Sequence, residues 1–126
     1  MPQQGIALIT VLAVLFTALA MVRTAMMRAK HKIMAPATTG NPEFERAFRV
    51  HLNTVESMVM FIPLLWLGAQ YRAIVAFWFG AAWLIGRVVY MLGYMSEPEK
   101  RGPGAIITLL SLAGLFILAL LGIFGV

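Results

Sequence analysis

Four long apolar runs alternate with short polar connections along the chain. The runs cover residues 5–22, 54–70, 73–94 and 105–126. Each approaches or exceeds the roughly 20 residues that a helix needs to cross a hydrocarbon core about 30 Å thick. With their polar flanks, the predicted helices span about 5–32, 43–70, 73–95 and 103–126. We therefore expect an all-α, multi-pass integral membrane protein, a bundle of four transmembrane helices that forms one membrane domain over residues 1–126.

The polar connections contain the residues that end and start helices. The connection at 31–45 holds two prolines and a glycine, which interrupt a helix, and Asn41 is placed to cap the helix that follows, with Pro42 in its first turn. The connection at 70–72 is very short, so the two helices beside it are expected to run antiparallel. The connection at 96–104 is again rich in proline and glycine.

Composition narrows the possible chemistry. The chain is 61% hydrophobic and only 12% charged, and it has no cysteine and two histidines. Soluble proteins carry about twice that share of charge, and without cysteine neither a disulfide nor a protein thiol nucleophile is possible. We expect no protein metal site. The first apolar run lacks a basic segment before it and is predicted to be a retained helix rather than a cleaved signal.

The net charge of +5 is unevenly distributed. Basic residues flank the first and third connections, namely Arg28, Lys30, Lys32, Arg46, Arg49, Lys100 and Arg101, whereas the second connection has only Arg72. The positive-inside rule predicts that the first and third connections are cytoplasmic and that both termini lie outside. The lysines are also explained by topology and contact with anionic lipid alone. No soluble basic domain is present, so we expect no nucleic-acid partner.

The segment 44–56 puts polar side chains at the start of the second predicted helix. At about 100° per residue, four residues fall within about 80° of one another, namely Arg46, Arg49, Asn53 and Glu56, whereas His51 lies on the opposite side. Charge at membrane depth is costly, so this polar stripe must face protein, water or a ligand. One explanation is an ion pair between Glu56 and Arg49 or Arg87, and the other is a bound ligand.

The third predicted helix supplies a second polar face. Arg87, Tyr90 and Tyr94 follow one another at i, i+3 and i+7 on one side of the helix. The tyrosines alone could form an aromatic belt at the membrane interface, and Arg87 could be a buried partner of Glu56. Together with Arg28 and the charged connection after Tyr94, however, these residues indicate a cationic cup for a small anionic ligand that also carries an amine.

These motifs resemble the family of membrane-associated proteins in eicosanoid and glutathione metabolism (MAPEG), which includes microsomal glutathione transferases and leukotriene and prostaglandin E synthases. The pattern Glu-Arg-x-x-Arg-x-His/Gln-x-Asn-x-x-Glu is filled by Glu45, Arg46, Arg49, His51, Asn53 and Glu56. The segments TTGNPEFER (38–46) and RVVYMLGY (87–94) are similar to the preceding loop and the third helix of that family.

The resemblance implies a homotrimer in which glutathione, the co-substrate, binds between adjacent subunits near the cytoplasmic face. The positions that match glutathione-binding residues of one subunit are Arg49, Asn53, Glu56, Tyr90 and Tyr94. Arg28 and His51 match positions that reach the same ligand from the neighbouring subunit. Arg101 matches the arginine at the thiol, where a cation would stabilise the thiolate.

The implied activity is conjugation of glutathione to lipophilic electrophiles from the bilayer, with reduction of lipid hydroperoxides as a related activity. Ser57 stands where leukotriene synthases carry a tyrosine, and His51 where they carry glutamine, which favours a general transferase. The expected location is a bacterial inner membrane, with the active site on the cytoplasmic side. Two alternatives stay open, a non-catalytic family member that binds lipid or glutathione, and a small proton-coupled exporter that uses Glu56.

Overall fold

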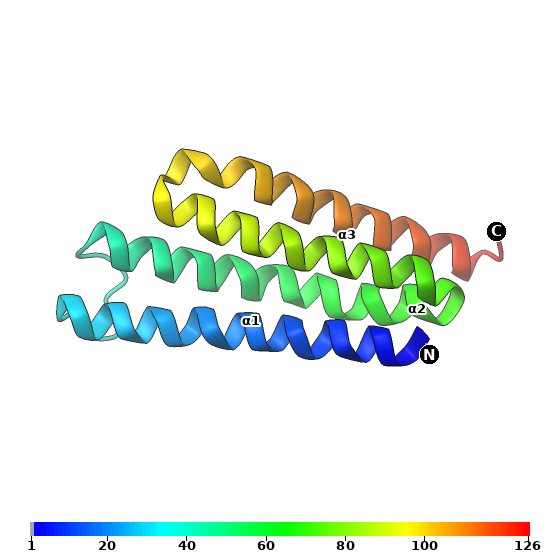
Figure 1. Cartoon of the computed structure of the whole chain (residues 1–126), viewed down its shortest axis with the longest axis horizontal. Coiled ribbons are helices and arrows are strands. Elements are labelled where there is room, and N and C mark those ends of the chain that lie inside the picture. Colours follow the sequence, from blue (N-terminus) through cyan, green and yellow to red (C-terminus); the bar gives the residue numbers. More distant parts are fainter. Residues whose placement is uncertain (1) are drawn as a thin grey trace.

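The computed structural model describes residues 2–126 and contains three long helices and one short 3₁₀ helix (Figure 1). The elements are α1 (Pro2–His31), α2 (Pro42–Ser96), η1 (Pro98–Arg101) and α3 (Gly102–Ile123). The three long helices are each long and apolar enough to cross a membrane. No strand occurs among the described residues, so the expected all-α architecture is confirmed.

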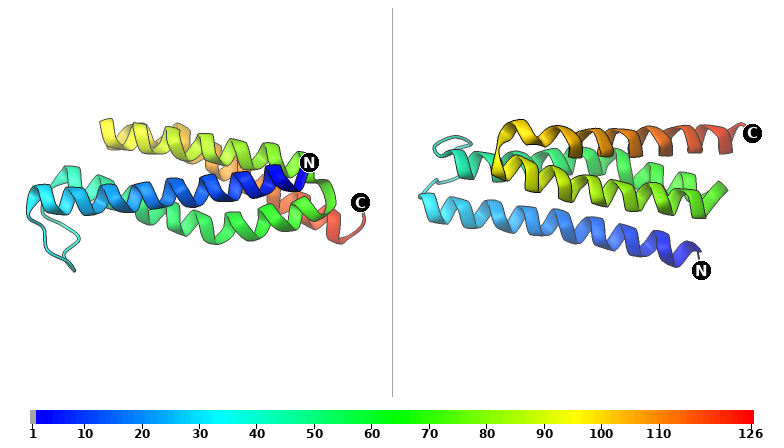
Figure 2. Two further views of the ribbon diagram at one scale, coloured as in Figure 1. Left: turned by 60° about the horizontal axis from the view of Figure 1, so that its bottom comes forward. Right: turned by 45° about the horizontal axis from the view of Figure 1, so that its top comes forward.

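Helix α2 turns back on itself at Arg72. The backbone of Arg72 is not helical, with φ −144° and ψ 77°, and the two limbs of α2, 42–71 and 73–96, run side by side in opposite directions (Figure 2). The two limbs lie where we expected separate helices, over 43–70 and 73–95, and the non-helical backbone of Arg72 divides them. This bend places residues 44–56 beside residues 87–96, which brings the two polar faces to the same part of the bundle.

The connection between α1 and α2 is fixed by polar contacts at the helix ends. The Asn41 Oδ1 atom accepts hydrogen bonds from the backbone N–H groups of Glu43 and Phe44, at 2.8 and 3.4 Å, which confirms the predicted cap. The Glu43 carboxylate accepts from His31 Nε2 at 2.8 Å and from Lys30 Nζ at 2.9 Å. These two donors lower the pKa of Glu43 to about 2.

The core lies where α2 packs against α1 and α3. Its centre is a stack of the Phe61 and Trp83 rings, whose centroids are 4.0 Å apart and whose planes are nearly parallel. Outside this core, large apolar side chains are exposed on every long helix, including Leu8, Trp78 and Leu109. So much exposed apolar surface would be unfavourable in water and is suited to lipid.

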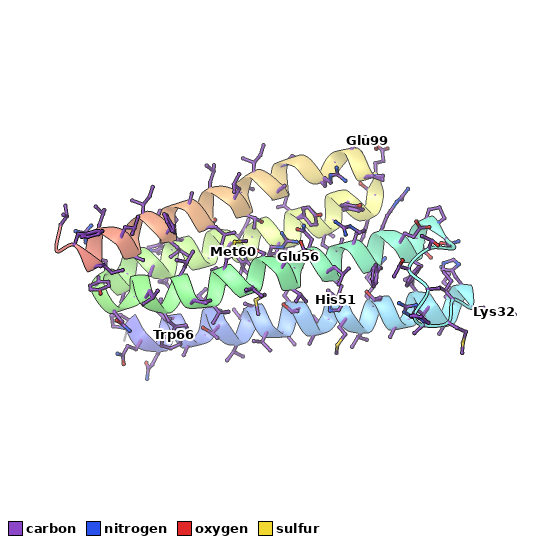
Figure 3. All side chains as sticks on the ribbon, turned by 180° about the vertical axis from the view of Figure 1, so that it is seen from behind. Lys32, His51, Glu56, Met60, Trp66 and Glu99 are labelled. Carbon is purple, nitrogen blue, oxygen red and sulfur yellow. The ribbon has the colours of Figure 1, made fainter. Side chains whose placement is uncertain are left out.

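The two polar connections lie at one end of the bundle, and both termini lie at the other end, near the bend of α2 (Figures 1 and 2). We call the first of these ends the connection end. The polar stripe on the first limb of α2 starts there and continues to about the middle of the bundle, where Figure 3 labels Glu56.

Candidate functional site

A first cleft opens at the connection end between the two limbs of α2. It has a volume of about 260 Å³, and its lining residues are Pro42, Glu45, Arg46, Arg49, Tyr94 and Pro98. Arg46 Nη1 donates a hydrogen bond to the backbone carbonyl of Met95 at 3.4 Å, which ties the two limbs together. The Arg49 side chain is exposed and, among residues 2–126, forms no ion pair, so its charge is available to the cleft.

Two tyrosines stand between two arginines in a series of contacts along the second limb of α2 and into η1. The Arg87 guanidinium carbon lies 4.3 Å from the centroid of the Tyr90 ring, and the Tyr90 and Tyr94 ring centroids are 5.6 Å apart. The Arg101 guanidinium carbon lies 5.6 Å from the Tyr94 centroid. Tyr90 is buried, Tyr94 is half-buried and Arg101 is exposed, so this series leads from the bundle interior to its surface.

Close backbone packing holds this series in place. Gly104, near the start of α3, lies so close to Tyr90 that a Cβ atom at position 104 would overlap the Tyr90 backbone. A Cβ atom at position 93 would likewise overlap the backbone carbonyl of Lys100. Glycine is therefore required at both places for η1 and the start of α3 to fold back against α2, and this packing positions Arg101 near Tyr94.

A second cleft, deeper in the bundle, contains the rest of the polar stripe. Its volume is about 190 Å³, and it is lined by Asn53, Glu56, Ser57, Met60, Arg87, Ala105, Thr108, Leu109 and Leu112. Asn53 is half-buried and Glu56 is exposed. The polar side chains come mainly from α2 and the apolar ones mainly from α3, so the cleft offers both polar contacts and apolar contact area.

Arg87 is the charged centre of the second cleft, and its partners differ from those considered in the sequence analysis. Its side chain is 1% exposed. Arg87 Nη2 donates to Asn53 Oδ1 at 3.2 Å and to Thr54 Oγ1 at 3.0 Å, and Nη1 donates to Thr108 Oγ1 at 3.5 Å. Within the described chain no ion pair joins Arg87 or Arg49 to Glu56. The explanation of the stripe as an intrachain ion pair is therefore not supported.

Thr54 and Thr108 are polar partners that the sequence analysis did not single out. Each lies in an apolar run and resembles an ordinary helix residue. The only available signal was the arginine itself, because an arginine within an apolar run requires polar neighbours. Thr108 comes from α3, so no spacing within α2 could have identified it.

Arg28 and His51 lie apart from the two clefts. Arg28 Nη1 donates to the backbone carbonyl of Ala37 at 2.7 Å, and its guanidinium carbon lies 4.7 Å from the centroid of the Phe44 ring. His51 is half-buried on the side of α2 that faces α1, whereas Glu56 lies on the side toward α3 (Figure 3). The predicted site residues therefore form two groups on different faces of the chain.

Ser57 has a structural partner in the core. Its hydroxyl oxygen accepts a hydrogen bond from the Trp83 indole N–H at 2.8 Å, and both side chains are buried. The small hydroxyl therefore satisfies a donor that would otherwise be buried without an acceptor. This contact gives a physical reason for a small hydroxyl side chain at position 57.

No group of three or more potential metal-ligating His, Cys, Asp or Glu side chains is found among residues 2–126. The donors and acceptors of the two clefts are guanidinium, amide, hydroxyl and carboxylate groups. Such a set binds an organic ligand with charges of both signs more readily than a metal ion.

Comparison with known proteins gives consistent matches over most of the chain. The family described as the MAPEG family matches residues 6–121. An uncharacterized protein of Synechocystis is 45% identical over 118 residues, which cover 93% of this chain and 86% of the relative. Human microsomal glutathione S-transferase 2 is 41% identical over 100 residues, covering 79% of this chain and 66% of that protein. Leukotriene C4 synthase of Cavia porcellus is 33% identical over 121 residues, covering 90% and 81%.

Proposed function

Because the chain belongs to the MAPEG family, we propose that it is a membrane-bound glutathione transferase that activates the glutathione thiol for attack on lipophilic electrophiles. The chain is an integral membrane protein. Relatives named for glutathione transfer and leukotriene C4 synthesis support a glutathione-dependent activity. The finer assignment to a general transferase rests on the residue types at positions 51 and 57, and we propose reduction of lipid hydroperoxides as a related activity of the same site.

The observation that carries this proposal is a set of charged groups without charged partners around the clefts. Arg49, Glu56 and Arg101 are exposed, and none forms an ion pair with another residue in the described range 2–126. Charges in or near a bilayer require neutralisation. Glutathione carries two carboxylates, one ammonium group and a thiol that can ionise. The Glu56 carboxylate would bind the ammonium group, and Arg49 and the Arg28 side chain of a neighbouring subunit would bind the carboxylates. Arg101 would be available to the thiolate.

The separate positions of Arg28 and His51 support an assembled site. We propose a homotrimer of subunits that each cross the membrane four times, with the two limbs of α2 as separate crossings. In this assembly Arg28 and His51 of one subunit would reach the glutathione held by Arg49, Asn53 and the tyrosines of its neighbour. A ligand between subunits explains why one helix has polar side chains on two faces.

We propose that Arg101, which is exposed and whose guanidinium carbon lies 5.6 Å from the Tyr94 ring centroid, stabilises the thiolate. A free thiol has a pKa near 8.5, so only about 3% is ionised at pH 7. Lowering that pKa by about two units requires about 2.7 kcal/mol of preferential thiolate stabilisation and raises the ionised fraction to about three quarters. One guanidinium beside the sulfur, in a site partly shielded from water, can supply an interaction of that size. Tyr94, next to Arg101, would help to hold the ligand.

The basic residues at the connection end support a cytoplasmic location for this end. We propose a bacterial inner membrane, where glutathione reaches the site from the cytoplasm and the lipophilic partner enters from the bilayer. The electrophile would contact the apolar wall of the second cleft, formed by Met60 and by leucines of α3.

Turnover of the purified protein tests the proposed function. Glutathione is supplied with an aryl halide in one assay and with a lipid hydroperoxide in another, and we expect conjugation in the first and reduction in the second. Arg101→Ala should lower the conjugation rate at pH 7 by at least about tenfold, because most of the bound thiol would no longer be ionised. Binding of glutathione without turnover in either assay would instead identify a non-catalytic binding protein.

A further inference from the structure

Arg87 is a buried cation whose charge is not balanced by a carboxylate of the described chain. It is 1% exposed, and its partners are the Asn53 amide, two threonine hydroxyls and the face of the Tyr90 ring. Its Nε atom is buried and has no hydrogen-bond partner among the described residues. Burying a charge in this way costs free energy, and an apolar side chain of similar volume would often be tolerated better. Stability alone therefore does not explain an arginine at this position.

The Asn53 side chain depends on Arg87 for its hydrogen bond, whereas the two threonine hydroxyls do not. The Thr54 hydroxyl also donates to the backbone carbonyl of Val50 at 2.7 Å, and the Thr108 hydroxyl donates to that of Gly104 at 2.9 Å. Both hydroxyls would therefore keep a partner without Arg87. In the described chain, the Asn53 side chain has Arg87 as its single hydrogen-bond partner.

This contact determines which end of the Asn53 amide is available to a ligand. A guanidinium is a donor only, so the atom of Asn53 next to Arg87 must be the carbonyl oxygen. The amide nitrogen then occupies the other branch of the side chain and presents its two N–H donors away from Arg87. Asn53 is half-buried on the wall of the second cleft, beside the exposed carboxylate of Glu56.

We propose that Arg87 is a positioning residue that fixes the orientation of the Asn53 amide, so that Asn53 offers only hydrogen-bond donors to an acceptor oxygen of glutathione. This inference rests on the proposed function, because it assigns the direction of one contact with the same ligand. Arg87 acts through Asn53 and does not contact the reacting sulfur. Asn53 then binds an acceptor group while Glu56 remains free to bind the ammonium group.

The first test is Asn53→Asp, with glutathione affinity measured by calorimetry and thermal stability measured in the same detergent. An aspartate can pair with Arg87, so we expect thermal stability equal to or above that of the wild type. It has no donor, so we expect the Kd for glutathione to rise roughly tenfold or more. Asn41→Asp is the matched control, since aspartate caps a helix as well as asparagine does, and its affinity should be unchanged. Wild-type affinity in Asn53→Asp would overturn the proposal.

The second test is a double-mutant cycle that combines Arg87→Met with Asn53→Ala. If Arg87 acts through Asn53, Arg87→Met weakens glutathione binding by roughly fivefold or more in the wild type and has no further effect once Asn53 is alanine. The KM for glutathione should rise, while kcat at saturating glutathione stays within about threefold. Equal weakening in both backgrounds would show a merely structural Arg87 and overturn the proposal.

A conservative variant and a matched control complete the test of Arg87. Arg87→Lys retains the charge and one donor toward Asn53 and should restore part of the affinity, even if Arg87→Met does not fold. Arg23→Met is the matched control for loss of an arginine, because Arg23 also has a buried Nε atom without a partner in the described chain and lines neither cleft. Absence of glutathione binding by the wild type would refute the proposed function, whereas binding that is insensitive to both Arg87 and Asn53 would refute only the present inference.

Discussion

The buried hydrogen bond between Ser57 and Trp83 is predicted to contribute measurably to stability. Ser57 is 5% exposed and Trp83 is fully buried, and the indole N–H donates to the serine hydroxyl at 2.8 Å. Ser57→Ala removes the acceptor but changes the packing volume little. The Trp83 ring is held in place by its stack on Phe61, so the indole N–H cannot easily turn toward another acceptor.

The cost of Ser57→Ala in free energy of unfolding can be estimated from two general ranges of hydrogen-bond energy. Leaving a buried donor unsatisfied costs about 1–3 kcal/mol, and side-chain hydrogen bonds between membrane helices average about 0.6 and reach about 1.7 kcal/mol. Because both partners are buried, we expect the upper part of the membrane range. Ser57→Ala should therefore lower the free energy of unfolding by about 1–2 kcal/mol.

Reversible unfolding in mixed micelles measures this value, and a double-mutant cycle with Trp83→Phe isolates the hydrogen bond. In the Trp83→Phe background no indole N–H is present, so Ser57→Ala should cost less than about 0.5 kcal/mol. The reasoning would be refuted if Ser57→Ala were neutral in the wild type, or if it cost the same in both backgrounds.

Two further predictions concern backbone packing and the assembled site. Gly104→Ala should lower stability by about 1–3 kcal/mol and reduce turnover, since the added methyl group overlaps the Tyr90 backbone, whereas Gly102→Ala, with no atom within 4 Å of the added methyl group, should do neither. Thermal unfolding of the two variants compares these outcomes, and equal stability would show that the close approach is not required. His51→Ala and Glu56→Gln should each abolish most activity, but subunits of the two variants refolded together should regenerate wild-type sites at about a quarter of interfaces in a cyclic trimer. No recovery in the mixture would place His51 and Glu56 in the same subunit's site.

The features that could be predicted from the sequence are those set by local chemistry and helix periodicity. Asn41 caps α2 because its short side chain precedes Pro42 and can accept from the next N–H groups. A helical repeat alone places Asn53 and Glu56 on one face and His51 on another. In the structure His51 and Glu56 lie on different sides of α2 (Figure 3), and Asn53 and Glu56 line the same cleft.

The features that could not be predicted depend on contacts between distant segments. The sequence allows an ion pair between Arg87 and Glu56, since opposite charges in an apolar environment attract each other. The packing of α3 instead brings Thr108 to Arg87, and the bend of α2 brings Asn53 and Thr54 to it. Which neighbours reach a buried arginine depends on the depth at which the helices pack, and hydrophobic periodicity does not specify that depth. The role of Ser57 as a hydrogen-bond acceptor could not be predicted either, because it depends on which residue of the second limb packs at the same depth.

The thiolate absorbance of glutathione bound to the purified protein tests the central claim most directly. On mixing at pH 7, we expect an absorbance increase close to that of one thiolate per occupied site, and a pH titration that gives a pKa about two units below that of free glutathione. Arg101→Ala should bind glutathione but show little of this signal. Bound glutathione that remains a neutral thiol in the wild type, or a thiolate signal unchanged in Arg101→Ala, would contradict the account.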